Sequence, residues 1–181
     1  MKTIGVLALQ GNVALHEQAL RQHQFATRLI RQPPQLSEVD GLVLPGGETT
    51  ALLKLMAPWD FHSAITSFAA SGRPILGTCA GAILLASEVN PRQASLGLMD
   101  ISIERNAYGR QLDSFVGYSD ETQEQLVFIR APKVTAVGNQ VDVILRQAGD
   151  PVLLRQGHIM AATYHPEMSG YARVAEFFNR T

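Results

Sequence analysis

Short apolar runs alternate with helix-like segments through the first half of the chain. The first run, residues 4–9, has no polar alternation, which is typical of a strand covered on both faces. Residues 26–30 predict another strand, and the apolar runs at 41–44 and 74–76 predict a third and a fourth. These strands are expected to form the centre of one sheet.

Helical periodicity fills the spaces between the runs. Residues 13–23 predict a helix whose inward positions are Val13, Leu15, Ala19 and Leu20, and whose outward positions are His16, Glu17, Gln18 and Arg21. Asp60 is expected to cap a helix that reaches residue 70 and stops at Gly72. A further helix is predicted at 82–86.

The second half of the chain is β-prone. From residue 98 onward, antiparallel or mixed strands are predicted at 101–104, 126–129, 134–137, 141–145 and 152–154. A further strand at 159–164 and a closing helix at 171–179 follow. Strands that alternate with helices form a parallel sheet covered on both faces. We therefore expect a three-layer α/β fold with a mostly parallel central sheet and additional antiparallel strands in the C-terminal half.

Length and composition narrow the class of protein. The 181 residues suggest one domain, 1–181, and the net charge of −1 and pI near 6.5 argue against nucleic acid or an anionic membrane as a partner. With 46% hydrophobic residues the chain can fill a core. The lone cysteine excludes an internal disulfide and favours the cytoplasm, and the run 4–9 is too short to span a bilayer.

The turn-forming residues follow strands. Ligand sites of parallel α/β sheets lie beyond the carboxyl ends of the strands, so Gln10, the Gly46–Gly47 pair and Cys79 are expected to share one edge. Cys79 lies at the centre of residues 77–81 (GTCAG), between an apolar strand and an apolar helix. This is the context of a nucleophile elbow, in which glycines permit a sharp turn. The alternative is a small cysteine buried in the core.

A thiol nucleophile needs a base and a group that orients the base. His165 and Glu167 flank Pro166, which favours an extended His165 from which Glu167 can reach the imidazole. The other histidines, at 16, 23, 62 and 158, are expected to lie on the surface without a role. The chain has no ligand spacing typical of a metal site.

Acyl transfer also needs hydrogen-bond donors for a developing oxyanion. The backbone amides of Gly46 and Gly47, with that of Ala80 beside the cysteine, are the candidates. Taken alone, the 45–47 segment is equally compatible with an ordinary tight turn.

These motifs resemble those of the class I, or triad-type, glutamine amidotransferases, and within them the glutaminase subunit family of pyridoxal 5′-phosphate synthase. The resemblance covers nearly the whole chain and rests on residues 5–11, 44–50, 77–81, 104–111, 113–115, 128–132 and 165–167. The elbow and the His-Pro-Glu motif mark the superfamily, whereas 105–111 and 128–132 select the subunit. The fold so implied is flavodoxin-like.

The resemblance implies the roles of the site residues. Cys79 would attack the carboxamide of L-glutamine, His165 would carry the proton, and Glu167 would orient His165. The residues implied to hold glutamine are Gly47, Glu48, Thr49, Arg105, Ile129 and Arg130. Without the motif, Arg105 and Arg130 would be ordinary surface charges.

The family also implies a partner. Ammonia would pass to a synthase subunit, a (β/α)-barrel protein in a dodecameric ring, and this chain would itself hold no cofactor. Gln10 matches a position near the subunit contact that helps to set the oxyanion loop. Thr49 stands where the family usually has serine, and residues 116–125 look shortened. These departures concern the affinity for the substrate or the fit to the partner more than the type of reaction.

Alternative functions remain at this point. The chain could serve another class I amidotransferase, although residues 105–111 argue against this. In a non-catalytic binding module, or in an elbow-cysteine protein of the DJ-1 type, the triad is absent or altered, and the intact Cys79, His165 and Glu167 argue against both.

Overall fold

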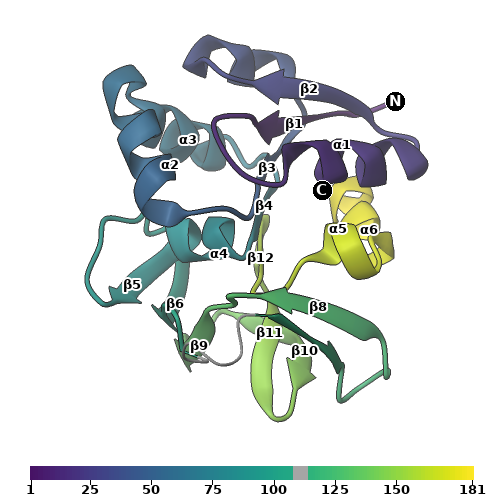
Figure 1. Ribbon diagram of the computed structural model, residues 1–181. Coiled ribbons are helices and arrows are strands. Elements are labelled where there is room, and N and C mark those ends of the chain that lie inside the picture. Colours follow the sequence, from purple (N-terminus) through teal and green to yellow (C-terminus); the bar gives the residue numbers. More distant parts are fainter. Residues whose placement is uncertain (108–113) are drawn as a thin grey trace.

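The computed structural model describes residues 1–107 and 114–181 and centres on a seven-stranded sheet (Figure 1). The strands follow the order β10 (Asp142–Gln147), β11 (Asp150–Gln156), β12 (Ile159–Ala162), β4 (Ile75–Thr78), β3 (Gly41–Leu44), β1 (Thr3–Leu7) and β2 (Ala26–Ile30). From β12 to β2 all neighbours run parallel, and β11 and β10 are antiparallel. The parallel part has the flavodoxin-like order, which confirms the predicted fold class.

Side chains alternate between two cores. In β3, Leu42 and Leu44 pack in one hydrophobic cluster and Val43 in the other, and in β12 Met160 lies opposite its neighbours Ile159 and Ala161. Both faces of these strands are apolar and buried. This explains why their sequences show no polar alternation.

Helices cover both faces of the sheet. One face carries α1 (Val13–Gln22) and α6 (Ala172–Arg180), and the other carries α2 (Thr49–Met56), α3 (Phe61–Ala70) and α4 (Ala80–Leu85). The remaining helical segments are the short α5 (Pro166–Ser169) and two 3₁₀ turns, η1 (Pro33–Glu38) and η2 (Ala57–Trp59). The described chain is thus layered as helix, sheet and helix (Figure 1).

Two small sheets flank the central one. The first contains β5 (Ala86–Asn90), β6 (Met99–Glu104) and β9 (Lys133–Val137), and the second pairs β7 (Ser114–Tyr118) with β8 (Gln125–Ile129). In these two sheets β5 and β6 are parallel, whereas β6 and β9, and β7 and β8, are antiparallel. This confirms the mixed pairing predicted for the second half of the chain. The turn after β6 and the end of β8 reach the site described below.

Several predicted boundaries differ from the structure. The first and last parallel strands each end two residues earlier than predicted, since the chain turns into loops after Leu7 and Ala162. Helix α2 was not predicted, and it begins where the Glu48 carboxylate caps the amides of Thr50 and Ala51. Asp60 precedes α3 in a left-handed conformation and makes no side-chain cap to its backbone.

The buried face of α1 was predicted wrongly. His16 is fully buried together with Ala19 and Leu20, whereas Leu15 is 39% exposed. The buried positions 16, 19 and 20 follow the helical period, and position 15 is turned away from them. His16 tolerates burial because it has polar partners, which are described below.

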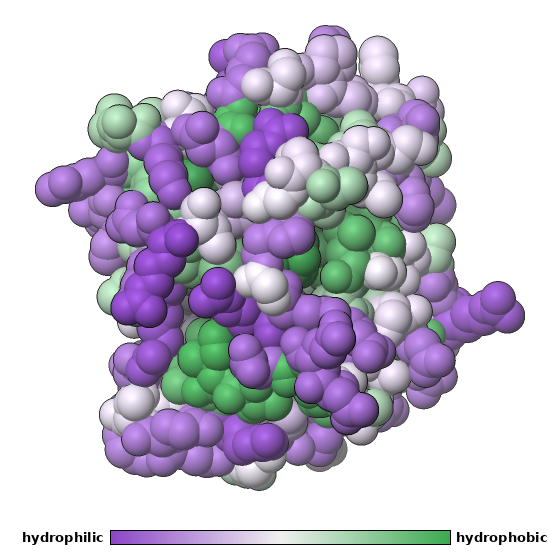
Figure 2. Space-filling view, turned by 180° about the vertical axis from the view of Figure 1, so that it is seen from behind, coloured by the Kyte–Doolittle hydropathy of each residue, from purple (hydrophilic) through white to green (hydrophobic). Residues whose placement is uncertain are grey.

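Hydrophilic residues dominate the rear of the molecule, where hydrophobic residues reach the surface only in separate areas (Figure 2). Within the described ranges, no helix has the length and apolar character needed to cross a bilayer.

Candidate active site

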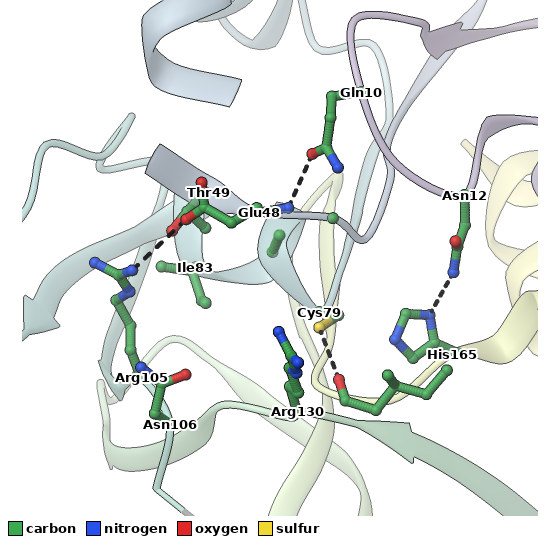
Figure 3. A pocket seen from close by; sticks show the side chains of 13 residues that line it. Gln10, Asn12, Glu48, Thr49, Cys79, Ile83, Arg105, Asn106, Arg130 and His165 are labelled. Atoms are coloured by element: carbon green, nitrogen blue, oxygen red, sulfur yellow. Dashed lines mark hydrogen bonds and ion pairs between the residues drawn. The ribbon is translucent and has the colours of Figure 1, made fainter. Parts of the chain in front are cut away.

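The loops after β1, β3 and β4 converge on one pocket, together with the segment after β12 (Figure 3). The pocket has a volume of about 360 Å³. It is lined by Gln10, Asn12, Gly47, Glu48, Thr49, Cys79, Ala80, Ile83, Arg105, Asn106, Ile129, Arg130 and His165. The expected common edge is confirmed, because Gln10, Gly47 and Cys79 all face this pocket.

Cys79 occupies a strained turn between β4 and α4. Its φ of 48° and ψ of −103° are unusual for a residue with a side chain. The flanking glycines allow this turn, because a Cβ on Gly81 would collide with the Leu44 carbonyl and one on Gly77 would lie 2.6 Å from the Gly81 carbonyl carbon. The sulfur lies 3.6 Å from the Ile129 carbonyl oxygen. This geometry is that of a nucleophile elbow.

His165 and Glu167 form a tight pair beside the cysteine. The imidazole Nδ1 lies 2.7 Å from Glu167 Oε1, and Asn12 donates from Nδ2 to the same oxygen at 3.3 Å. Glu167 lies in the first turn of α5 rather than in an extended segment, so the predicted contact is present but its backbone geometry is different. Both side chains are almost completely buried.

Electrostatics within this group favour a charged pair. Burial alone would lower the pKa of His165, but the neighbouring Cys79 side chain and the hydrogen bond with Glu167 raise it to about 10. Burial acts to raise the pKa of Glu167, yet the hydrogen bond from His165 and the proximity of His16 hold it below its usual value. The arrangement therefore stabilises an imidazolium beside the sulfur.

The loop after β3 is held by three hydrogen bonds. The Gly46 amide donates to Thr78 Oγ1 at 3.1 Å, and the Gly46 carbonyl accepts from the Asn12 amide at 3.0 Å. Gln10 Oε1 accepts from the Glu48 amide at 2.8 Å. Because its amide is engaged by Thr78, Gly46 cannot donate to an oxyanion in this conformation, contrary to the sequence-based assignment. Gly47 and Ala80 line the pocket and remain candidates.

Charged groups gather at the other end of the pocket. The guanidinium of Arg105 follows β6 and lies 4.0 Å from Glu48 Oε1. Hydrogen bonds from the Thr50 and Ala51 amides keep the pKa of Glu48 below its usual value. Figure 3 shows Arg130 below Cys79, on the loop after β8, where its φ of 46° ends the strand.

Thr49 is turned partly away from this group. It is 4% exposed, and its hydroxyl donates to Gln93 Oε1 at 3.1 Å. The part of the family motif at residues 108–111 and 113 lies outside the described residues. Within the described part, no cluster of three histidine, cysteine or acidic side chains is arranged to hold a metal ion.

The sequence did not reveal several of the site's neighbours. Asn12 and Ile83 line the pocket, and His16, Thr78 and Tyr171 are buried behind it. The prediction that His16 lies on the surface is wrong. A lone histidine in an amphipathic helix carries no local signal for partners that come from distant segments.

Known proteins share both sequence and fold with this chain. Residues 6–181 match the SNO glutamine amidotransferase family. The chain is 45% identical to "Pyridoxal 5′-phosphate synthase subunit PdxT" of Koribacter versatilis, with 97% of this chain and 93% of the relative covered. The protein of the same name from Solibacter usitatus is 44% identical, with 98% of each chain covered.

A solved structure agrees with these relatives. A crystal structure of a glutamine amidotransferase superposes with a TM-score of 0.89 at 36% identity and covers 98% of this chain and 97% of its own. The chain belongs to the SNO glutamine amidotransferase family.

Proposed function

We propose that this chain is the glutaminase subunit of a pyridoxal 5′-phosphate synthase. It hydrolyses L-glutamine to L-glutamate and ammonia and delivers the ammonia to a synthase subunit. Cys79, His165 and Glu167, gathered at one end of a single pocket, are the observation that carries this proposal. The relatives named after this synthase supply the reaction context.

Catalysis proceeds through a thioester. The Cys79 sulfur attacks the carboxamide carbon of glutamine, and His165 takes the thiol proton and passes it to the departing ammonia. Water then attacks the γ-glutamyl thioester and gives a proton to His165. The C–S bond breaks, His165 returns that proton to the Cys79 sulfur, and glutamate is released. Glu167 stabilises the imidazolium each time it forms and holds the ring in place when it is neutral.

The oxyanion is held by backbone amides. Ala80 is the first residue of α4, so its N–H has no acceptor in the helix's own ladder. Gly47 is the second donor. The peptide between Gly46 and Gly47 is fixed by the hydrogen bond from the Asn12 amide to the Gly46 carbonyl. The following amide, that of Glu48, donates to the Gln10 side chain.

Glutamine binds with its carboxamide at the Cys79 sulfur and its α-carboxylate and α-ammonium groups at the other end of the pocket. The Arg105 guanidinium and the Arg130 backbone and side chain receive the α-carboxylate, because charged donors of this kind suit a carboxylate. Glu48 accepts from the α-ammonium group, while Thr49 and Ile129 shape the walls.

The partner controls the oxyanion loop. Gln10 and Asn12 flank Gly11 and hold both sides of that loop, so contact with a synthase subunit can reset the Gly47 amide through them. The synthase subunits are arranged as a dodecameric ring. The isolated chain is therefore expected to be a poor glutaminase, and equal turnover with and without the synthase subunit would contradict this coupling.

The test is a coupled assay. Wild type and Cys79→Ala are each mixed with the synthase subunit, a pentose phosphate, a triose phosphate and glutamine, and glutamate and pyridoxal phosphate are both measured. We expect both products from wild type and neither from Cys79→Ala, with synthesis restored in the variant by added ammonium salt. Glutamate release without pyridoxal phosphate would assign the chain to a different amidotransferase.

A further inference from the structure

A chain of buried hydrogen bonds runs from the start of α6 to the oxyanion loop. Tyr171 Oη lies 3.0 Å from His16 Nδ1, and His16 Nε2 lies 3.1 Å from Thr78 Oγ1. Thr78 Oγ1 in turn accepts from the Gly46 amide at 3.1 Å. His16 and Thr78 are fully buried and Tyr171 is 5% exposed, so none of these groups can exchange its partner for bulk water.

The same histidine also reaches the triad carboxylate. His16 Nε2 lies 3.3 Å from Glu167 Oε2, an oxygen that is buried and has no hydrogen bond within the described chain. The other oxygen, Oε1, is occupied by His165 and Asn12. Within the described residues, His16 Nε2 is thus the polar atom that faces Oε2.

The tautomer of His16 follows from its partners. Burial is the main reason why the pKa of His16 is lowered to about 4, so the ring is neutral near pH 7 and carries one proton. Burial also raises the pKa of the Tyr171 hydroxyl, which therefore stays protonated and is able either to donate or to accept. The Glu167 carboxylate beside Nε2 can only accept, so the tautomer that fits both neighbours accepts from Tyr171 at Nδ1. The ring proton then lies on Nε2, where it points to Thr78 Oγ1 and faces Glu167.

We infer that His16 is a positioning residue for glutamine hydrolysis, whose Nε2–H fixes both the Glu167 carboxylate and, through Thr78, the Gly46 end of the oxyanion loop. This inference rests on the proposed glutaminase function. His16 does not line the pocket, so it acts on the catalytic groups and not on bound glutamine. Its loss should lower kcat and leave KM for glutamine nearly unchanged.

Replacement of His16 provides the main test, made with the synthase subunit present. His16→Leu removes both ring nitrogens and is expected to lower kcat about 10- to 100-fold, the effect of one hydrogen bond to a charged group. His16→Gln keeps an N–H near the position of Nε2 and should recover a large part of the loss. Thr78→Val should also lower kcat, and its effect should not add fully to that of His16→Leu, because both break the same chain of bonds.

Two control variants separate positioning from folding. Leu20→Val trims a fully buried side chain of the same helix that belongs to the hydrophobic core, and His62→Gln changes an exposed histidine whose ring contacts the Ser95 carbonyl. Both should retain wild-type kcat, although Leu20→Val lowers the melting temperature. The inference is wrong if His16→Leu keeps the wild-type kcat. It is also wrong if Leu20→Val loses as much kcat as His16→Leu for the same drop in melting temperature.

A spectroscopic measurement makes the test independent of activity and of the folding of His16→Leu. With ¹⁵N-labelled histidine, the His16 ring is expected to show the neutral Nε2–H tautomer in the wild type at pH 7. In Tyr171→Phe the donor to Nδ1 is lost, so the tautomers should mix and kcat should fall. A wild type that releases no glutamate would refute the proposed function, whereas an Nδ1–H tautomer in the wild type would refute the role of His16.

Discussion

Gly46 is the position at which one added methyl group should disturb catalysis while leaving the fold intact. A Cβ built there would lie 2.6 Å from Cε1 of His165 and 3.3 Å from the Cys79 Cβ. Ordinary contacts of a Cβ begin at 3.4 Å, so the imidazole of Gly46→Ala has to move by about 0.8 Å. The backbone of Gly46 is not in the left-handed region, so alanine can adopt it.

A displacement of this size is large for a proton-transfer group. Misplacement by about 1 Å can cost about 100-fold in rate, which is about 2.7 kcal/mol in activation free energy. We therefore expect Gly46→Ala to lower kcat for glutamine hydrolysis about 100-fold when the synthase subunit is present. KM should change much less, because Gly46 lies behind the pocket wall.

The control for Gly46→Ala is Gly170→Ala. Gly170 has extended backbone, with φ of 165°, and no atom lies within 4 Å of the position of an added Cβ. Gly170→Ala should match wild type in kcat and in melting temperature. If Gly46→Ala turns over glutamine at the wild-type rate with its fold intact, the contact between this loop and His165 does not limit catalysis.

Three further changes test other parts of the account. Glu167→Gln removes the carboxylate that raises the pKa of His165, so kcat should fall by up to about 10⁴-fold. NMR titration should show the pKa of His165 below its wild-type value of about 10, and an unchanged pKa would contradict the pairing of His165 with Glu167. Arg105→Ala should raise KM for glutamine about 10- to 100-fold with a smaller effect on kcat, and an unchanged KM would remove Arg105 from the binding site. The pKa of His16 is about 4 in the folded chain and 6.5 in the unfolded chain, so between these two pH values the unfolded chain binds more protons. The free energy of unfolding should therefore rise with pH from about 4 to 6.5. Urea unfolding of His16→Gln should show a shallower rise over the same range.

The sequence predicted the parts of the fold that depend on local pattern. Apolar runs marked the parallel strands, because residues such as Leu42 and Val43 both face hydrophobic clusters. Glycines at 77 and 81 marked the elbow, since close backbone approaches there leave no room for a side chain. Both signals are contained within a few neighbouring residues.

The parts that the sequence missed depend on distant contacts. Strand β5 follows α4 without a break and is defined by its parallel pairing with β6, which starts nine residues after β5 ends (99 − 90 = 9). His16 occupies a core position because its partners come from three separate segments, at 78, 167 and 171. Polar burial of this kind is balanced by hydrogen bonds that only the folded chain brings together.

The engaged Gly46 amide illustrates the same limit. The sequence marked both glycines of the loop as possible oxyanion donors, since neither has a side chain to obstruct a ligand. Only the folded structure shows that the hydroxyl of Thr78 already accepts from the first of them. The choice between two adjacent amides depends on a side chain from the neighbouring strand.

The covalent intermediate is the most direct test of the account. The chain has one cysteine, so an isotope-labelled glutamyl group captured by acid quench during turnover with the synthase subunit can be mapped by mass spectrometry. We predict that the label lies on the peptide that contains Cys79 and is lost in Cys79→Ala. Steady release of labelled glutamate with no label on Cys79, or with label on another residue, would contradict the thioester mechanism.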